Sequence, residues 1–513
     1  MPEDHLLQEQ ITKLNQIGIA LSSEINLEKL LELIVFEARG FTGGDAGSLY
    51  ILEEDTLYFR VSQNDTLNQR PGPSSGFKPY PLPVSRESIA GYVAITGEPL
   101  NIENVYDLPT SVPYKFNPDF DLRNDYVTKS MLVVPMRDRE GEVLGVLQVI
   151  NAKDKKGVVV GFPKSVEDLV MSLASQAAVA IRNAKLIADI KALFEALIRY
   201  SASAIDARSP HTAGHSRRVA AYSKAIALAI HDQTTGPFAG VFFAPEQLEE
   251  LSYAAWLHDI GKIGVPENIL DKNNRLTGEA MESIVNRFEL IKAIHLNRMY
   301  REGASVEDSN PKASASEGKD DSLNDPRSEE IRKLEGQLEE ELSLIQKTNR
   351  SSILSDEDLS ALQNIASKTY EDLSGDTIPY LSQKELEYLS VRKGNLTAEE
   401  YKRIQTHVEL TYNIVKNIPF TRSLKGVPLF SASHHELLDG SGYPKGLKGD
   451  EIPLQSRILA VVDIFDALTA ADRPYRRAMP PEKAGGILQE EANAGRLDTD
   501  IVNLFLDKKL YEI

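Results

Sequence analysis

The chain has 513 residues, of which 42% are hydrophobic and 26% charged, and its formal net charge is −19. This length exceeds a single hydrophobic core and predicts roughly three domain-sized units of an ordinary globular protein. The absence of cysteine excludes disulfides, zinc–thiolate sites, iron–sulfur clusters and cysteine nucleophiles, so a bound metal requires His, Asp and Glu ligands. The negative charge argues against binding to a nucleic acid polymer or an anionic membrane.

The sequence shows neither a secretory signal nor a membrane span. The first residues lack a basic region followed by an apolar one, and no run of about 18 apolar residues occurs. We therefore expect a cytoplasmic protein.

The first 185 residues have the pattern of a domain with helices on both sides of a sheet. Apolar residues recur at helical spacing over residues 5–40, which predicts two helices that enter the domain. Four alternating runs typical of strands follow, at Ala46–Leu52, Thr56–Val61, Met131–Arg137 and Val143–Asn151. Because no strand–helix–strand rhythm connects these runs, we expect an α+β domain built on an antiparallel sheet.

The same region resembles the GAF family of small-molecule sensor domains. The resemblance covers roughly residues 15–185 and lies in Gly44–Tyr50, Ile89–Val93, Glu98–Ile102 and Gly145–Asn151. It implies a regulatory domain whose ligand is unknown. Five residues are similar, at a different spacing, to the motif of cyclic-nucleotide-binding members: Asn151, Lys153, Phe162, Glu167 and Asp168. The alternative is a domain that serves only for dimerisation.

Residues 165–203 predict one long helix that connects this domain to the rest of the chain. Apolar residues lie three and four positions apart, and neither Gly nor Pro interrupts them. A stripe sustained over this length favours the seam of a parallel homodimer. The alternative is a single helix buried within one domain.

Residues 204–513 form a third region, which is interrupted by a polar, acidic insert at about 280–393. From about Arg301 to Glu340 aromatic residues are few, and we expect this part to remain unordered. Helical patterns at Ile331–Ile345 and Asp356–Tyr370 indicate arms or a lid. After the insert, Thr397 and Glu400 predict a capping box for the helix that carries His407.

Seven metal-ligating side chains are spread over this third region. Adjacent residues on a helix point about 100° apart, so His434 and His435 converge only if a helix ends there; surface histidines at a helix end are the alternative. The other candidates are His215, His258, Asp259, His407 and Asp463. Five imidazoles and two carboxylates suit two divalent ions that share one bridging carboxylate, an arrangement used in phosphoryl displacement. Without thiolates, iron or manganese is favoured.

These motifs occur in the order of the HD-GYP family of phosphohydrolases, and the region is identified as a member of it. The motifs are Gly214–Ser216, His258–Lys262, Gln405–His407, His434–Glu436, Asp439–Pro444 and Asp463–Thr469. The resemblance implies an all-α HD-GYP domain that hydrolyses the cyclic dinucleotide c-di-GMP. It also implies the ligand sets: one metal is held by His215, His258, Asp259 and Asp463, and the other by Asp259 as the bridge with His407, His434 and His435.

By the same resemblance, Asp259 and Lys262 are the candidate catalytic residues, and Lys262 holds a phosphate oxygen. Tyr443 is expected beside the substrate. Arg473 and Arg476 are candidate contacts to phosphate or guanine, with surface salt bridges as the alternative. The resemblance also offers a third metal as a further alternative, with His211 as its candidate ligand, because His211 stands one helical turn before His215, where some members of the family carry a glutamate ligand.

The sequence departs from the family pattern at three points. The insert separates Lys262 from His407, although the family usually places them close in sequence. Asp206 and Ser209 stand where Glu and Asp are common, and an extra residue precedes Arg473, which puts the arginine assignment in doubt.

Taken together, the residues predict a metal-dependent phosphodiesterase that opens c-di-GMP to linear pGpG or cuts it to GMP, under the control of the GAF-like domain. A related hypothesis changes the substrate to 3′,3′-cGAMP or another cyclic dinucleotide. A second hypothesis, of a different class, is a non-catalytic receptor, in which the insert blocks catalysis and the domain recruits a partner such as a diguanylate cyclase. A third is a generic HD nucleotidase acting on dNTPs or ppGpp, against which the His434–Pro444 stretch argues.

Overall fold

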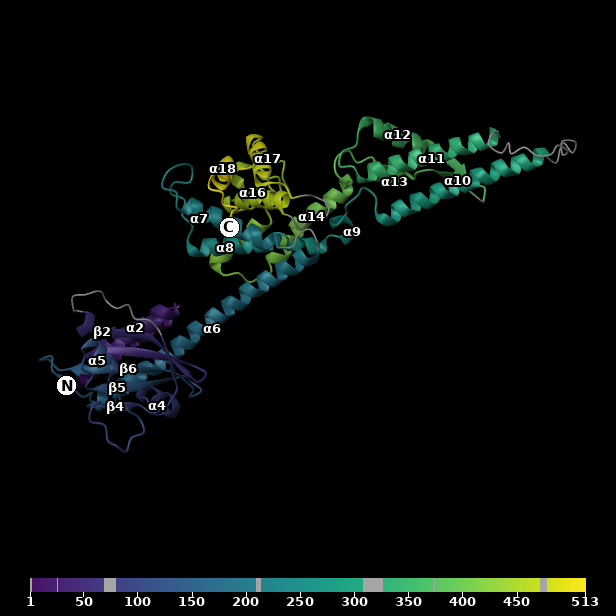
Figure 1. Ribbon diagram of the computed structural model, residues 1–513. Coiled ribbons are helices and arrows are strands. Elements are labelled where there is room, and N and C mark those ends of the chain that lie inside the picture. Colours follow the sequence, from purple (N-terminus) through teal and green to yellow (C-terminus); the bar gives the residue numbers. More distant parts are fainter. Residues whose placement is uncertain are drawn as a thin grey trace. The chain divides into compact units, whose positions relative to one another are not determined.

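The computed structural model describes residues 2–24, 26–68, 80–208, 214–307, 326–372, 374–470 and 478–513 (Figure 1). The chain divides into two compact units, Met1–Glu195 and Ala196–Ile513. Among the described helices, none has both the length and the apolar character that a bilayer crossing requires.

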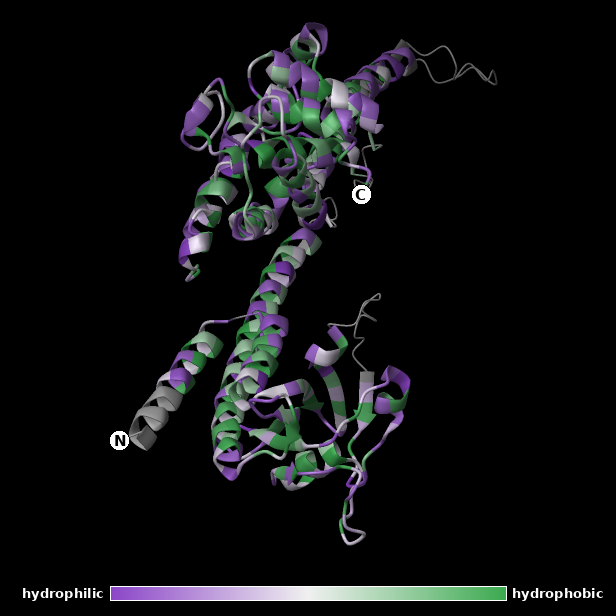
Figure 2. Ribbon diagram, turned by 90° about the vertical axis from the view of Figure 1, so that its left-hand side faces the viewer, coloured by the Kyte–Doolittle hydropathy of each residue, from purple (hydrophilic) through white to green (hydrophobic). Residues whose placement is uncertain are grey.

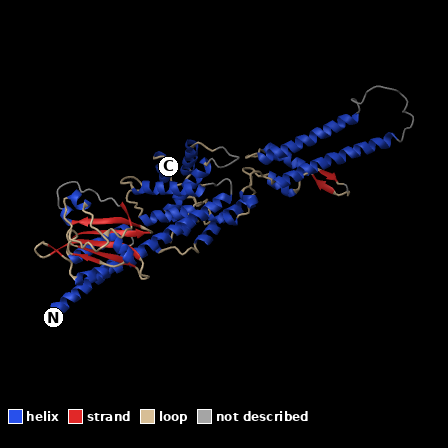
Figure 3. Cartoon of the chain, turned by 60° about the horizontal axis from the view of Figure 1, so that its bottom comes forward, coloured by secondary structure: helices blue, strands red, loops and turns tan. Residues whose placement is uncertain are grey.

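The first unit is built on an antiparallel sheet, as predicted. Its strands are β1 (Gly44–Glu53), β2 (Thr56–Asn64), β3 (Tyr80–Pro83), β4 (Leu100–Ile102), β5 (Met131–Arg137), β6 (Val143–Lys153) and β7 (Val159–Val160). The order is β3-β2-β1-β6-β5-β4, with β7 paired to β6, and all pairs are antiparallel. The strands are drawn in red in Figure 3. The four strands expected from alternation are confirmed, whereas the short β3, β4 and β7 were not predicted.

Helices cover both faces of this sheet. The helices of this unit are α1 (Pro2–Ser23), α2 (Leu27–Thr42), α3 (Asp65–Asn68), α4 (Ile89–Thr96), α5 (Asp119–Asn124) and the first part of α6 (Lys164–Arg208). Successive side chains of a strand point to opposite faces. Leu132 and Val134 of β5 therefore join the core beneath α1, α2 and α6, whereas Met131 and Val133 join the core beneath α4.

The residues similar to the cyclic-nucleotide motif form contacts inside this domain. Asn151 donates to the carbonyl of Val127 (2.7 Å), and Lys153 forms an ion pair with the buried carboxylate of Asp45. Phe162 is buried in the core beneath α6. Four of the five residues are thus engaged in the domain's own structure, since Glu167 also accepts a hydrogen bond, from Asn101.

The second unit is helical outside one small hairpin, which fits the predicted HD-GYP fold. Its helices outside the insert are α7 (His215–His231), α8 (Pro245–Leu257), η1 (Ile260–Gly264), α9 (Glu267–Leu270), α14 (Ala398–Val415), η2 (Arg422–Leu424), α15 (Val427–Ser431), η3 (Gly449–Glu451), α16 (Leu454–Thr469), α17 (Pro481–Asn493) and α18 (Thr499–Asp507). The predicted capping box at α14 is confirmed, because Thr397 and Glu400 each bind the other's backbone N–H.

The insert folds into an ordered helical subdomain. It consists of α10 (Gly278–Glu307), α11 (Pro326–Arg350), α12 (Asp356–Ser367), the strands β8 (Thr369–Glu371) and β9 (Thr377–Pro379), and α13 (Gln383–Leu389) (Figure 3). The expectation that residues 301–340 remain unordered is therefore wrong for 301–307 and 326–340. The polar composition of this stretch was a poor guide, because a few apolar residues are enough to form a core. Leu338 and Ile345 of α11 pack with Ile284, Phe288 and Ile291 of α10 in a separate hydrophobic core.

Buried polar contacts fix the base of the insert. The guanidinium of Arg275, which is fully buried, donates to the carbonyls of Thr348, Ser351 and Val391. The Nζ atom of Lys272 lies 2.7 Å from Glu400 at the start of α14. These contacts bring the two ends of the insert together, so the chain returns to the helical domain where α14 begins.

Candidate metal centre

The structure brings all seven predicted ligands into one cluster. His215 is the first residue of α7, and His258 and Asp259 follow the end of α8. His407 lies within α14 and Asp463 within α16. His434 and His435 lie in the turn after α15, so a helix ends there as expected.

One half of the cluster is formed by His215, His258, Asp259 and Asp463. The Nε2 atom of His215 lies 3.1 Å from Nε2 of His258, 3.2 Å from Oδ1 of Asp463 and 3.5 Å from Oδ2 of Asp259. Nε2 of His258 lies 3.4 Å from the same Asp259 oxygen and 3.6 Å from Oδ1 of Asp463. Two nitrogens and two carboxylates thus face one point.

The other half contains the remaining three histidines. Nε2 of His407 lies 3.5 Å, and Nε2 of His434 4.0 Å, from Oδ1 of Asp259. The ring of His435 lies 4.1 Å from that of His434, between centroids. Asp259 therefore directs Oδ2 to one half of the cluster and Oδ1 to the other, which is the placement that a bridging carboxylate needs.

Gly261 allows the two halves to approach each other. A Cβ atom at this position would lie 2.0 Å from the carbonyl oxygen of His407. The N–H of Gly261 donates to the hydroxyl of Thr411 (3.0 Å), which in turn donates to the carbonyl of His258 (3.0 Å). Backbone packing of η1 on α14 therefore sets the position of His258 relative to His407.

Hydrogen bonds at the outer ring nitrogens orient four of the histidines. The Nδ1 atoms of His258, His407 and His434 lie 2.7, 2.6 and 2.6 Å from the backbone carbonyls of Ala255, Ile404 and Ser431, respectively. Nδ1 of His215 instead lies 2.8 Å from the carboxylate of Asp466. When Nδ1 carries the proton, Nε2 presents its lone pair to the centre of the cluster.

Asp466 was missed by the sequence analysis. It follows Asp463 by three positions on α16, so both carboxylates lie on one face of that helix. Nε of Arg218 holds Asp466 at 2.6 Å. A second carboxylate one turn after a candidate ligand, on an apolar helix, is the signal that could have identified it.

Three buried atoms of the cluster lack a hydrogen-bond partner among the described residues: Oδ1 of Asp259, Nε2 of His407 and Nε2 of His434. A buried polar atom without a partner costs about 1–3 kcal/mol. All three are lone-pair donors that face one another, which is the chemistry of a site for divalent cations. The residues therefore fit a metal centre.

The pKa values of the cluster differ between its two halves. Burial would lower the pKa of His215 and of His258, but Asp259 and Asp463 raise the first well above its ordinary value and the second to about 9, so these two rings must release a proton when metal binds.

The pKa values of the other three histidines favour metal binding directly. Burial lowers the pKa of His407 and of His434, and it lowers that of His435 to about 4, so these imidazoles are neutral at pH 7. Burial would raise the pKa of Asp259, but Lys262 and His258 hold it well below its usual value. Neutral imidazoles and an ionised carboxylate are the forms that bind metal.

Lys262 and Tyr443 border the cluster. The ammonium group of Lys262 forms an ion pair with Asp259. The ring of Tyr443 lies 4.8 Å from that of His435, between centroids. The loop that carries Tyr443 is held by the buried carboxylate of Glu436, which accepts hydrogen bonds from the N–H groups of Lys445 (2.8 Å) and Leu447 (2.9 Å). The sequence analysis did not predict this role of Glu436. The other candidates, His211, Arg473 and Arg476, lie outside the described residues.

Comparison with known families assigns both units. The GAF domain family matches residues 26–181, and two HD domain families match residues 212–344 and 384–501. The chain combines a GAF domain with an HD domain. Residues 345–383 of the insert separate the two HD matches, which together contain all seven clustered residues. The GAF and HD predictions are thus confirmed, as is the fold of an antiparallel α+β domain followed by a helical one.

Curated relatives match parts of this HD region. The 3′3′-cGAMP-specific phosphodiesterase 3 of Vibrio cholerae is 45% identical over 19% of this chain and 21% of its own. The cyclic di-GMP phosphodiesterase response regulator RpfG of Xanthomonas campestris is 40% identical over 21% of this chain and 27% of its own. The matches thus span about a quarter of these relatives or less. A solved GAF domain of an Acinetobacter phosphoenolpyruvate-protein phosphotransferase is 21% identical, covering 35% of this chain and 98% of its own (TM-score 0.27).

Proposed function

We propose that this GAF–HD protein is a metal-dependent phosphodiesterase that hydrolyses cyclic dinucleotides, with c-di-GMP as its substrate. The observation that carries this proposal is the cluster of five imidazoles and two carboxylates, in which Asp259 faces both halves and three buried lone-pair atoms lack partners. We propose iron or manganese as the metals, because nitrogen and oxygen ligands without thiolate suit them. When bound, such a pair activates a water molecule and neutralises phosphate charge.

The protein's own residues then position the substrate. Lys262 contacts Asp259 at the edge of the cluster, and this position supports a role of its ammonium group in binding a non-bridging phosphate oxygen. Tyr443, which lies against His435, forms a wall beside the same position. Asp466 holds the ring of His215 through Nδ1, and Arg218 holds Asp466, so the ligand ring cannot turn away.

The experiment is a turnover assay with two substrates. The full-length chain, loaded anaerobically with Fe²⁺ or with Mn²⁺, is incubated with c-di-GMP and with 3′,3′-cGAMP at equal concentrations. We expect linear pGpG or GMP from c-di-GMP, at a higher kcat/KM than for cGAMP. Both specificities occur among the names of the relatives, so faster cGAMP hydrolysis would correct the substrate and keep the chemistry. The alternative of a receptor that recruits a diguanylate cyclase requires no turnover of either substrate by the intact chain.

We also propose that two copies of the chain associate through α6. A row of exposed apolar side chains, each 50–74% exposed, follows this helix at alternating spacings of four and three: Leu186, Ile190, Leu193, Leu197 and Tyr200. Apolar residues recur along the helix in Figure 2. This spacing is that of the a and d positions of a coiled coil, and the GAF domain would then act on a dimer.

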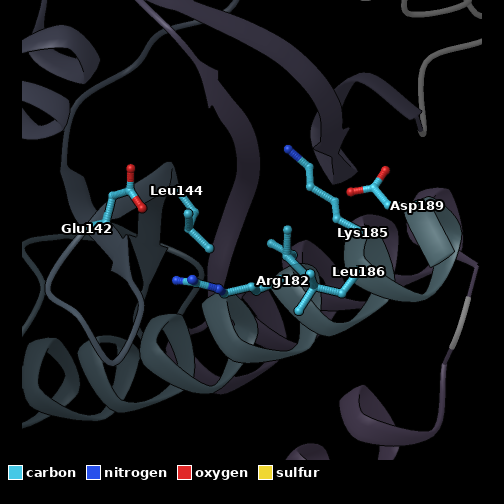
Figure 4. A pocket seen from close by; sticks show the side chains of 7 residues that line it. Glu142, Leu144, Arg182, Lys185, Leu186 and Asp189 are labelled. Atoms are coloured by element: carbon cyan, nitrogen blue, oxygen red, sulfur yellow. The ribbon is translucent and has the colours of Figure 1, made fainter. Parts of the chain in front are cut away.

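A cavity lies where this row begins. It has a volume of about 220 Å³, and Figure 4 shows Arg182, Lys185, Leu186 and Asp189 of α6 lining it beside Glu142 and Leu144. In a dimer, the exposed side of Leu186 would be covered.

Sedimentation equilibrium tests the association of two chains through α6. The double variant Ile190→Glu/Leu197→Glu is expected to be monomeric, whereas Ala192→Glu, on an exposed position outside the row, is expected to remain dimeric. A monomeric wild-type chain would refute it.

A further inference from the structure

A second cavity lies behind the metal centre, on the outer side of the His434–Pro444 turn. It has a volume of about 220 Å³ and lies between α14, the end of α15 and the turn. Its lining residues are Val408, Glu409, Tyr412, Asn413, Leu429, Ala432, Ser433, Pro444 and Lys445. On α14, His407 and Tyr412 are five residues apart and therefore point about 140° away from each other. The cavity is thus distinct from the point where the ligand nitrogens converge.

The cavity combines an aromatic ring with a cation in its lining, Tyr412 with Lys445, and a second cation, Lys416, lies beside the same ring. Tyr412 is 42% exposed, and the ammonium groups of Lys416 and Lys445 lie 5.4 and 6.0 Å from its ring centroid. Lys416 also donates to Asn413 (2.6 Å). An exposed ring offers a face on which a planar base stacks, and ammonium groups bind phosphate. A ligand that is both planar and anionic satisfies both features.

Glu409 adds a preference among such ligands. It lies on the same face of α14 as Tyr412, three residues earlier, and it lines the cavity. A carboxylate only accepts hydrogen bonds, and guanine presents two adjacent N–H donors, N1–H and N2–H, on its pairing edge. Adenine presents an acceptor, N1, at the corresponding place. The carboxylate of Glu409 in the lining therefore favours guanine over adenine.

We propose that this cavity binds a guanine mononucleotide, with the base on Tyr412, the pairing edge at Glu409 and the phosphate between Lys416 and Lys445. Three of its walls adjoin residues of the metal centre: Val408 follows His407, Ser433 precedes His434, and Pro444 follows Tyr443. Binding there acts on the backbone that carries those side chains. If the proposed hydrolysis continues past linear pGpG, its final product is such a nucleotide, and in that respect the regulatory role rests on the proposed function.

The test is binding of 5′-GMP to the full-length chain by isothermal titration calorimetry, once as isolated and once after chelation of metal. We expect one saturable site per chain after chelation, and the same site with unchanged affinity in the chain as isolated, with weaker binding of AMP, of guanosine and of inorganic phosphate to it. Tyr412→Leu is expected to weaken GMP binding by about tenfold or more, because the stacking face is lost. Tyr412→Phe keeps that face and is expected to bind like wild type. Lys445→Gln is expected to weaken GMP but not guanosine.

Matched controls separate the cavity from general effects. Phe242→Leu removes another exposed ring of the same unit, and Lys402→Gln removes another exposed charge of α14, so neither is expected to change GMP binding. Equal affinity of Tyr412→Leu and wild type, binding that requires metal, or no saturable binding of GMP would each overturn the proposal. None of these measurements uses turnover, so a failed phosphodiesterase assay leaves their outcome interpretable.

Discussion

Oδ1 of Asp259 lies 3.5 Å from Nε2 of His407, although a folded subdomain separates these residues in sequence. The insert therefore leaves the centre assembled. Its two ends are joined by Arg275, and Lys272 connects it to Glu400 at the start of the helix that carries His407. A sequence that departs from its family by a long insertion can retain the geometry of the site when the insertion closes on itself at its base.

Removing His407 is expected to disrupt the half of the centre that lies beyond the insert. His407→Gln leaves Oδ1 of Asp259 without its nearest facing nitrogen, so we expect the chain to lose about half of its bound metal by inductively coupled plasma mass spectrometry. Substitution of a residue that only orients a metal ligand typically costs about 10- to 100-fold in activity. We expect turnover to fall by more than this, because His407 is itself a proposed ligand. His295→Gln changes a histidine of the insert and serves as the control. This variant should keep the metal content and the turnover of wild type. Full metal content in His407→Gln would show that this residue is not a ligand.

Asp466 is expected to act through His215. Asp466→Asn keeps the size of the side chain but removes the charge that holds Nδ1 of His215 at 2.8 Å. We expect metal affinity to fall by about 10- to 100-fold, measured by competition with a chelating dye. Asp450→Asn changes an exposed carboxylate of the same unit and should leave the affinity unchanged. An unchanged affinity in Asp466→Asn would mean that the ring of His215 is held by its other contacts alone.

Gly261 offers a test of backbone packing. In Gly261→Ala, the new Cβ would meet the carbonyl of His407 at 2.0 Å, so η1 and α14 must separate. We expect a loss of about 1–3 kcal/mol in the free energy of unfolding, measured with urea, together with reduced turnover. Gly278→Ala has nothing within 4 Å of its new Cβ and should match wild type. Equal stability of the two variants would contradict the close approach.

The stability of the insert is expected to depend on pH through Glu385. Burial would raise the pKa of this carboxyl, but hydrogen bonds from Arg287 and from the Ser382 N–H hold it below its ordinary value of 4.5. A carboxyl with a depressed pKa in the folded state stabilises the fold above its unfolded pKa, and this contribution is lost as the pH falls through the folded value.

Urea unfolding of wild type and of Glu385→Gln measures this contribution. Wild type should be more stable by about 1–3 kcal/mol at neutral pH, and the difference should shrink progressively below pH 4.5. Glu387→Gln, an exposed neighbour on α13, provides the control and should show no such pH dependence. A difference that stays constant between neutral and acidic pH would show that Glu385 stabilises the insert by packing alone.

Much of the fold followed from local patterns. The four long strands, the two N-terminal helices and α6 were predicted because their periodicities of 2 and 3.6 reflect which side of each element is buried. Thr397 and Glu400 marked the start of α14 because a capping box depends only on residues three positions apart. The short strands β3, β4 and β7 escaped prediction, since two to four residues are too few to show a period.

The sequence by itself determined which groups are available to hold metal, because the absence of cysteine and the spacing of the histidine motifs are properties of the chain. Only the tertiary structure decided how they meet. It placed the two oxygens of Asp259 toward different histidines, set Asp466 behind His215, and ordered the insert around Ile284 and Leu338. These outcomes depend on contacts between residues far apart in sequence, and no local period or composition encodes the direction in which two such side chains face.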